Sequence, residues 1–420
     1  MLLSYLKLAM KVFLRRRVFT AISLFGITFT LLVLVVATSV LDHATAPVAP
    51  ETRQERTLCV YSARMTGDDN TWQSEAGYGF FDRYMRGLPG VERMSIFSEA
   101  TPVASYRNGG RIDSVLKRAD GEYWKILDFS FLEGGPFTVD DVANARFVAV
   151  INETTRNRFF GGEPAVGKVI EADGQRFQVV GVVPDVPLLR TIPFADIWVP
   201  ITTAKSDGYK REVMGGFLGI FLVGSPADFP ALREELQARL KAVELPDPKM
   251  WKQIEAHPYT AIERVAAIFL ESGPGRALTG RGEHQLAVFC MLVAGLVLLF
   301  MLLPTLNLVN LNVSRILERA SEIGVRKAFG ASSYMLVGQF VVENVVLTLA
   351  GGLVALFLSP MVLQALTATQ LVPYAHFTLN HRVFAYGLGF AVVFGVLSGV
   401  YPAWRMSRLH PVEALNGGAR

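Results

Sequence analysis

Four long apolar segments dominate the hydrophobic pattern of the chain. Residues 18–41 form a run of 24 without a charge, residues 285–314 a run of 30 and residues 383–404 a run of 22, and in residues 334–359 the one charge is Glu343. A helix rises about 1.5 Å per residue, so about 20 residues cross the roughly 30 Å hydrocarbon layer of a bilayer. All four segments are long enough, so we expect an α-helical membrane protein with four transmembrane helices.

The first apolar segment has an alternative interpretation as a cleaved signal peptide. Arg15, Arg16 and Arg17 precede it, and Ala44-Thr45-Ala46 has the small residues of a cleavage site. The apolar core of a signal peptide has only about 7–15 residues, so the length favours a retained anchor. One span then precedes, and three follow, the long segment 42–283.

Lysine and arginine gather beside the spans on one side of the membrane. Residues 1–17 hold five of them and no acid, residues 311–334 hold four and residues 405–420 hold three, whereas residues 360–380 hold none. Such residues flank spans on the cytoplasmic side, so both termini are expected inside and residues 42–283 outside. The outer segment has 28 Lys+Arg against 33 Asp+Glu, so the inner face supplies the net charge of +4. That excess favours contact with anionic membrane lipid and argues against nucleic-acid binding.

The segment before the first span repeats apolar residues at helical spacing. Leu2, Leu6, Met10 and Phe13 fit either a helix in the headgroup region or a cytoplasmic extension of the span. The expected organisation is a cytoplasmic amphipathic segment at 1–17, spans at 18–41, 284–310, 334–359 and 381–404, an outer domain at 42–283, a cytoplasmic loop at 311–333, an outer loop at 360–380, and a cytoplasmic tail at 405–420.

The outer segment shows the alternation of a mixed α+β domain. Residues 146–151 resemble a strand, and Asn152 can cap a helix that ends near Phe160. Residues 168–172 and 175–183 flank Asp173-Gly174, the pair that a type I′ hairpin turn prefers. The continuous apolar run 217–223 predicts a buried strand. After it, Asp228 can cap a helix that carries Leu232, Leu236 and Leu240 on one face.

One stretch of the outer segment matches the spacing of a phosphate-binding loop. Gly162, Gly167 and Lys168 fit G-x-x-x-x-G-K, but Val169 occupies the place of the Mg²⁺-binding hydroxyl. The stretch would also link a helix to a strand, the reverse of the order that aims backbone N–H groups at phosphate. We expect a structural turn. The sequence offers no metal-binding or catalytic motif, and Asp68-Asp69-Asn70 fits a solvated loop.

Polar residues cluster at the inner end of the second span. Asn307 and Asn310 lie within it, and Glu322 and Arg326 follow at a spacing that stabilises a helix. Gly330 can end that helix. The loop 311–333 is therefore expected to contain a short cytoplasmic helix.

This run resembles the permease signature of the MacB/FtsX family of ABC transporters, a type VII superfamily. Residues 284–410 match its FtsX-like permease domain, and the outer segment resembles its MacB-like periplasmic core domain. The matching motifs are Ser321-Glu322-Ile323-Gly324-Val325-Arg326-Lys327-Ala328-Phe329-Gly330-Ala331, Tyr401-Pro402-Ala403-Trp404-Arg405, Phe159-Phe160-Gly161 and Val180-Gly181-Val182-Val183.

The resemblance implies a mechanism and a set of partners. The helix with Glu322, Ile323, Gly324, Arg326, Lys327 and Gly330 would contact the ATPase that drives the spans and the outer domain. In MacB an ATPase domain precedes the first span, whereas 17 residues do so here. A separate ABC ATPase would therefore bind ATP and Mg²⁺, and this chain, which is not expected to be an enzyme, would need no cofactor. Other implied partners are a second permease copy in a homo- or heterodimer, and a periplasmic adaptor with an outer-membrane channel.

Two functional outputs fit the same resemblance. The first is export or extraction of a substrate on the outer side of a bacterial inner membrane. The second is FtsX-like signalling, in which the same motion activates an extracytoplasmic partner such as a cell-wall hydrolase. The large outer segment favours the first. Glu343 would lie inside the third span, where an acid needs a partner, and we expect it to be structural, while Gly351-Gly352 permits close helix packing.

Overall fold

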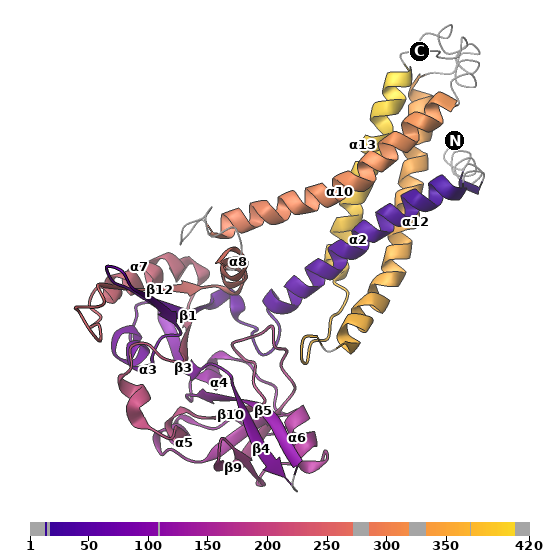
Figure 1. Ribbon diagram of the computed structural model, residues 1–420. Helices are drawn as coiled ribbons and strands as arrows, with labels where there is room; N and C mark the ends of the chain where they lie inside the picture. Colours follow the sequence, from indigo (N-terminus) through magenta and orange to yellow (C-terminus); the bar gives the residue numbers. More distant parts are fainter. Residues whose placement is uncertain are drawn as a thin grey trace. The chain divides into compact units, whose positions relative to one another are not determined.

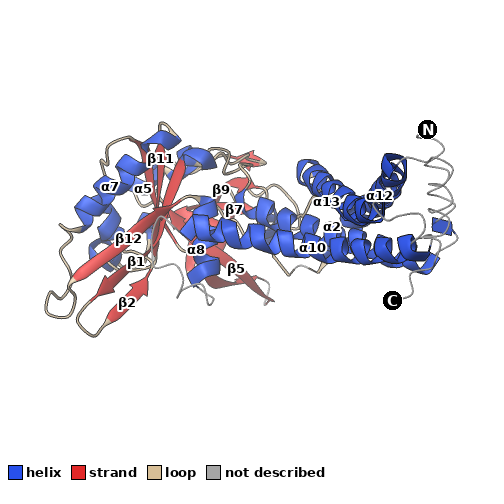
Figure 2. Ribbon diagram, turned by 90° about the horizontal axis from the view of Figure 1, so that it is seen from above, coloured by secondary structure: helices blue, strands red, loops and turns tan. Residues whose placement is uncertain are grey.

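The computed structural model describes residues 13–14, 17–107, 110–271, 285–318, 333–369 and 371–407. The chain divides into two parts, a mixed α/β part formed by His43–Phe289 with Val372–Ala375, and a helical part formed by the rest of the described chain. Figure 1 follows the chain through both parts. Figure 2 shows that the strands belong to the mixed part and that long helices make up the helical part.

Long apolar helices form the helical part. They are α2 (Arg17–Thr45), α10 (Gln285–Glu318), α12 (Ser333–Ala368) and α13 (His381–Ser407). Among the described residues, the segments Thr20–Thr45, Gln285–Leu302 and Val341–Ala368 are long and apolar enough to cross a membrane, and α13 has a shorter apolar stretch, His381–Leu397.

Glycines bring helices of this part close together. A Cβ atom on Gly351 would lie 2.8 Å from Ile27 Cγ2 of α2, and one on Gly352 would lie 2.4 Å from Leu388 Cδ1 of α13. Thr28 Oγ1 also donates a hydrogen bond of 3.1 Å to Gly351 O. The glycine pair therefore permits the close packing expected from the sequence, because small residues let helix backbones approach each other.

Helix α12 is longer than the sequence suggests. It continues past Ser359, where the span was expected to end, and through Pro360 to Ala368, so the first part of the expected outer loop 360–380 is helical. Proline removes one helical N–H, yet apolar helices tolerate it where other groups bond the backbone. Here Ser359 Oγ donates to Ala355 O at 2.6 Å, next to Leu356 O, the carbonyl that lacks the N–H of residue 360.

The mixed part is built on a sheet that contains twelve strands in the described chain. The strands are β1 (Thr57–Thr66), β2 (Thr71–Ser74), β3 (Val91–Ser98), β4 (Thr101–Arg107), β5 (Gly110–Ala119), β6 (Glu133–Gly134), β7 (Val148–Asn152), β8 (Val169–Ala172), β9 (Gln175–Val183), β10 (Ile197–Pro200), β11 (Phe217–Val223) and β12 (Gln253–Tyr259). Their order is β12-β1-β11-β3-β5-β10-β7-β9-β6, with β2, β4 and β8 paired to β1, β5 and β9. The pairs β5–β10 and β7–β9 are parallel, and the other pairs are antiparallel.

Helices cover this sheet and bury three hydrophobic clusters. The helices are α3 (Tyr78–Phe80), α4 (Tyr123–Ile126), α5 (Val139–Ala143), α6 (Glu153–Phe160), α7 (Phe229–Leu240) and α8 (Ala261–Glu271), with short 3₁₀ or π turns at Gln54–Arg56, Phe81–Met85, Ile201–Thr203, Asp207–Arg211 and Pro226–Asp228. Helix α7 lies beside β12 and β1 (Figure 1). Its Leu232, Leu236 and Leu240 are buried in the cluster that β1, β3, β11 and β12 share.

Several local predictions are confirmed in the mixed part. Asn152 caps α6 by accepting a hydrogen bond from Thr155 N at 2.8 Å. Asp173 and Gly174 join β8 to β9 with φ of 54° and 68°, the positive values that a type I′ turn requires. All seven residues of β11 are buried.

The predicted cap of α7 is wrong. Asp228 occupies the N-cap position, but its side chain makes no capping bond to that helix. It accepts instead from Ser225 N at 3.0 Å, as part of a capping box on the preceding 3₁₀ turn. The competing donor is three residues away, the distance at which such boxes form.

We predict that Gly351→Val destabilises the helical part, whereas Gly389→Val does not. A Cβ on Gly351 would meet Ile27, whereas one on Gly389 of α13 would meet nothing within 4 Å. Overpacking of this kind costs about 1–3 kcal/mol. Thermal unfolding of the full chain in detergent measures the difference, and equal midpoints for the two variants would show that α2 and α12 do not pack through Gly351.

Candidate functional site: a loop that anchors two chain segments

The predicted site residues fall in three places. Glu322, Ile323, Gly324, Arg326, Lys327 and Gly330 lie outside the described residues. Asn307 and Asn310 lie within the described backbone of α10. Glu343 is buried in α12, with 1% of its surface exposed.

Glu343 belongs to a polar layer inside the helical part. Gln339 Nε2, one turn earlier on α12, donates to Glu343 Oε1 at 3.1 Å. The next residue, Asn344, donates from Nδ2 to Gly395 O of α13 at 3.3 Å, and Thr348 Oγ1 donates to Asn344 O at 2.9 Å. The Asn344 bond connects α12 with α13, whereas Glu343 is bonded by Gln339 within α12. An acid in a span needs such a partner, which favours a structural role for Glu343.

The phosphate-loop match at Gly162 to Val169 forms a structural turn. It links α6 to β8, and its backbone amides are already bonded within the protein: Ala165 N donates to Glu133 Oε2 at 2.8 Å, and Gly167 N donates to Val179 O at 2.8 Å. The Lys168 ammonium forms an exposed ion pair of 2.8 Å with Glu163. Helix, loop and strand therefore follow in the order that the sequence predicted, and the loop does not form a phosphate cradle.

A different set of polar residues gathers around the loop 184–196, which we call the anchor loop. Its central residue is Arg190, of which 4% is exposed. Arg190 Nη2 donates to Ala46 O at 2.9 Å, and Nη1 donates to Val48 O at 3.4 Å and to Glu51 Oε2 at 3.0 Å. The guanidinium thus holds the chain directly after α2.

The ion pair between Arg190 and Glu51 lies away from water. The two side chains are 3% and 7% exposed. Burial raises the pKa of Glu51 above its ordinary value, and the Arg190 charge opposes that rise. A buried carboxylate without its guanidinium would be strongly disfavoured, so each partner stabilises the charge of the other.

The same loop binds the segment that connects α12 to α13. Tyr374 Oη donates to Asp196 Oδ1 at 2.8 Å, and Leu188 N donates to Pro373 O at 3.2 Å. Asp196 is itself fixed, because Asn152 Nδ2 donates to Oδ1 at 2.9 Å and Val115 N donates to Oδ2 at 2.8 Å. Burial, with the adjacent Asp196 carboxylate, raises the pKa of Tyr374, so its hydroxyl stays a donor at neutral pH.

Lys117 of β5 fastens the anchor loop to the sheet. Its Nζ donates to Thr191 O at 2.8 Å and also to Ile192 O, and Tyr123 Oη donates to Ile192 O at 2.9 Å. The side chain is 1% exposed. Burial lowers the pKa of Lys117 from 10.5 to about 7, although Cys59, Glu51 and Glu99 act in the opposite direction.

Sequence reasoning did not find these residues. Arg190 interrupts an apolar stretch, and Lys117 occupies an inward position beside Leu116 of a strand. A charged residue in an apolar pattern is a signal of a buried partner. Glu51 is 139 residues away from its partner Arg190, and Tyr374 is 178 residues away from its partner Asp196, so the pattern alone could not identify these pairs.

Apolar helices on either side of a mixed α/β domain define a membrane protein with a domain inserted between its spans. The sequence profile of the MacB-like periplasmic core domain matches residues 20–239, and that of the FtsX-like permease C-terminal domain matches residues 294–411. The chain belongs to the MacB/FtsX family of ABC transporter permeases. This confirms the predicted fold class, with one membrane helix before and three after a mixed α+β domain of the periplasmic type.

Known relatives include a protein of similar length and proteins that are about twice as long. It is 23% identical over 338 residues to the uncharacterized ABC transporter permease YknZ of Bacillus subtilis, a match that covers 80% of this chain and 79% of YknZ. It is 25% identical to the macrolide export ATP-binding/permease protein MacB of Bdellovibrio bacteriovorus, covering 78% of this chain but 47% of that protein. The chain thus spans about half the length of such MacB relatives.

Solved structures also align with about half of this chain, at low TM-scores. The extracellular domain of YknZ aligns with a TM-score of 0.37 at 16% identity, covering 48% of this chain and 98% of that structure. The periplasmic region of MacB from Actinobacillus actinomycetemcomitans aligns with a TM-score of 0.38 at 15% identity, covering 51% and 92%. Likenesses of this size carry no residue-level detail over to this chain.

We predict that Arg190→Met destabilises the mixed part far more than Arg53→Met. The first change leaves Glu51 buried without its partner, which costs about 3–5 kcal/mol. Arg53 pairs with Asp128, but these side chains are 32% and 45% exposed, and such pairs contribute about 1 kcal/mol or less. Unfolding followed by the fluorescence of the buried Trp124 and Trp198 gives both values, and similar losses would contradict the importance of the anchor loop.

The pKa of Lys117 predicts a dependence of stability on pH. Its pKa is lower in the folded state than in the unfolded chain, so between about pH 7 and pH 10 the unfolded chain binds more protons and the contribution of Lys117 to stability rises with pH. Lys117→Met lacks this titration. The unfolding free energy of wild type minus that of Lys117→Met should therefore increase from about pH 7 to about pH 9.5, and a constant difference would show that Lys117 is not buried as a neutral amine.

Proposed function

We propose that this chain is the membrane subunit through which a separate ABC ATPase moves an extracytoplasmic domain to export or extract a substrate. Family membership implies an ATPase partner, and relatives named as macrolide export proteins favour export as the direction. ATP and Mg²⁺ would bind to the ATPase, and this chain would need no cofactor of its own. The membrane would be the inner membrane of a bacterium, with residues 42–283 in the periplasm.

The observation that supports this proposal is the anchor loop. Within the mixed part, one short loop holds the chain that leaves α2, through Arg190, and the chain that connects α12 to α13, through Tyr374 and Leu188. A displacement of either membrane segment would pull on the same loop. Lys117 and Asp196 would then transmit the displacement to β5 and β10, because Asp196 directly precedes β10.

The inner contact would lie in the loop 311–333. We propose that the helix around Glu322, Ile323, Gly324, Arg326, Lys327 and Gly330 docks against the ATPase. These residues match the family signature and lie on the basic side of the spans. Four spans enclose little volume, so a homo- or heterodimer with a second permease is part of the proposal. A periplasmic adaptor with an outer-membrane channel would complete an export path.

Variants at the proposed ATPase contact and at the anchor loop test the two parts of the proposal separately. Arg326→Glu and Lys327→Glu should weaken ATPase association or uncouple hydrolysis, because truncation of a buried interfacial pair costs about 2–5 kcal/mol. Tyr374→Phe should leave ATPase association unchanged but reduce movement of the outer domain, because it removes the bond to Asp196. The full chain with its ATPase in nanodiscs would be assayed for association, ATP hydrolysis, and distance changes between spin labels in the outer domain.

Tyr386→Phe is the matched control, because this tyrosine of α13 is 69% exposed. It should leave all three measurements at the wild-type level. If both charge reversals kept association and hydrolysis unchanged, the ATPase would dock elsewhere. If Tyr374→Phe moved the outer domain as wild type does, the anchor loop would not transmit the motion.

A further inference from the structure

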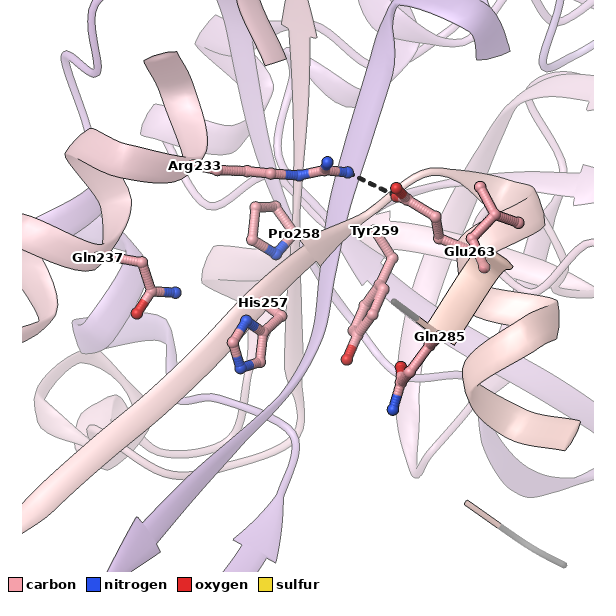
Figure 3. A pocket seen from close by; sticks show the side chains of 8 residues that line it. Arg233, Gln237, His257, Pro258, Tyr259, Glu263 and Gln285 are labelled. Carbon is pink, nitrogen blue, oxygen red and sulfur yellow. Dashed lines mark hydrogen bonds and ion pairs between the residues drawn. The ribbon is translucent and has the colours of Figure 1, made fainter. Parts of the chain in front are cut away.

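A pocket of about 190 Å³ opens at the edge of the sheet in the mixed part. Arg233 and Gln237 reach it from α7, His257 and Tyr259 from β12, and Glu263 from α8 (Figure 3). Strand β12 ends the strand order of the described sheet and pairs with β1. The pocket therefore lies at a strand edge with a helix on either side, and none of the proposed coupling contacts belongs to it.

The polar groups of this pocket are held in place by bonds within the wall. Arg233 Nη2 donates to Glu263 Oε2 at 2.6 Å, and the same oxygen accepts from Thr260 N at 2.8 Å in a capping box of α8. Gln237 Nε2 donates to Ala256 O at 2.9 Å, a carbonyl of β12. Fixed side chains of this kind lower the entropy that a ligand must remove on binding.

Charge and size define the kind of ligand that fits. Arg233 and Glu263 form an ion pair and neutralise each other. A charged ligand would therefore lose its hydration on binding without an opposite charge in the pocket to compensate for that cost. The rings of His257 and Tyr259 lie on the same side of β12 (Figure 3), and their centroids are 6.3 Å apart. A cavity of about 150 Å³ is enough to hold a benzene ring, so the volume here admits one substituted ring.

The pocket also contacts the beginning of a membrane helix. Gln285 and Leu286, the first residues of α10, line it, and Gln285 is 4% exposed. The apolar stretch Gln285–Leu302 starts at the same residue. A buried amide at the pocket wall is the type of group that fixes the orientation of a ligand in a mostly apolar site.

We propose that this pocket binds an uncharged, ring-bearing small molecule, or such a group on a larger one, that carries hydrogen-bonding atoms. The ring packs against His257 and Tyr259, and the polar atoms of the ligand bond to the amides of Gln237 and Gln285 and to the Tyr259 hydroxyl. This binding is independent of the ATPase contact and of the anchor loop, so it is tested without either.

The test uses the full chain in nanodiscs with 4-hydroxybenzamide as the probe and 4-hydroxybenzoate as its charged counterpart. Saturation-transfer NMR reports binding. The wild type should bind the amide at least tenfold more tightly than the carboxylate. Gln237→Trp should abolish binding by filling the pocket, whereas Ala238→Trp, at the exposed neighbouring position of α7, should not.

A milder variant keeps the test decisive if Gln237→Trp does not fold. Tyr259→Phe retains the ring and removes one hydroxyl, so it should weaken amide binding by about three- to tenfold, the effect of one hydrogen bond. Absence of amide binding to the wild type, equal binding of the carboxylate, or unchanged binding by folded Gln237→Trp or by Tyr259→Phe would each overturn the proposal. None of these outcomes depends on ATP hydrolysis or transport.

Discussion

The ion pair between Arg190 and Glu51 is the interaction that fixes the path of the chain from α2 into the mixed part. A guanidinium has five N–H donors in a fixed plane, so one buried side chain can bond to several acceptors at once. Here it bonds to two backbone carbonyls and one carboxylate of the segment that follows α2. Replacing this pair by apolar side chains would preserve burial but would not fix the path of that backbone, because apolar contacts are not directional.

The anchor loop combines two kinds of constraint that have different strengths. Arg190 and Glu51 are both nearly inaccessible to water, so loss of either partner leaves a buried charge. Tyr374 contributes a single hydrogen bond to Asp196, which keeps two further donors when that bond is lost. The connection after α2 is therefore the stiffer of the two. We propose that the membrane helices are driven from the inner side. A given displacement of α2 would then move the sheet more than the same displacement of α12 and α13.

The sequence predicted what depends on local pattern and missed what depends on distant partners. The apolar segments, the Asn152 cap and the Asp173-Gly174 turn follow from neighbouring residues, and the structure has them. The cap at Asp228 failed because Ser225 offers a competing donor three residues away. Arg190, Lys117 and Tyr374 could not be assigned, because their partners come from elements that only the fold brings together. The predicted docking residues from Glu322 to Gly330 lie outside the described chain and remain a proposal.

The pocket and the anchor loop both belong to the mixed part. This part also contains the segments that lead into the membrane helices. Gln285 starts α10, whereas Ala46 and Tyr374 lie in the segments held by the anchor loop. A ligand shifts a conformational equilibrium only by the difference in its affinity for the two states. Ligand binding would thus influence transport only if movement of α10 changes the position of Gln285 in the pocket wall. By thermodynamic reciprocity, ATP binding at the partner would in that case change ligand affinity by the same factor, and the first turn of α10 would be the physical link between the pocket and the ATPase.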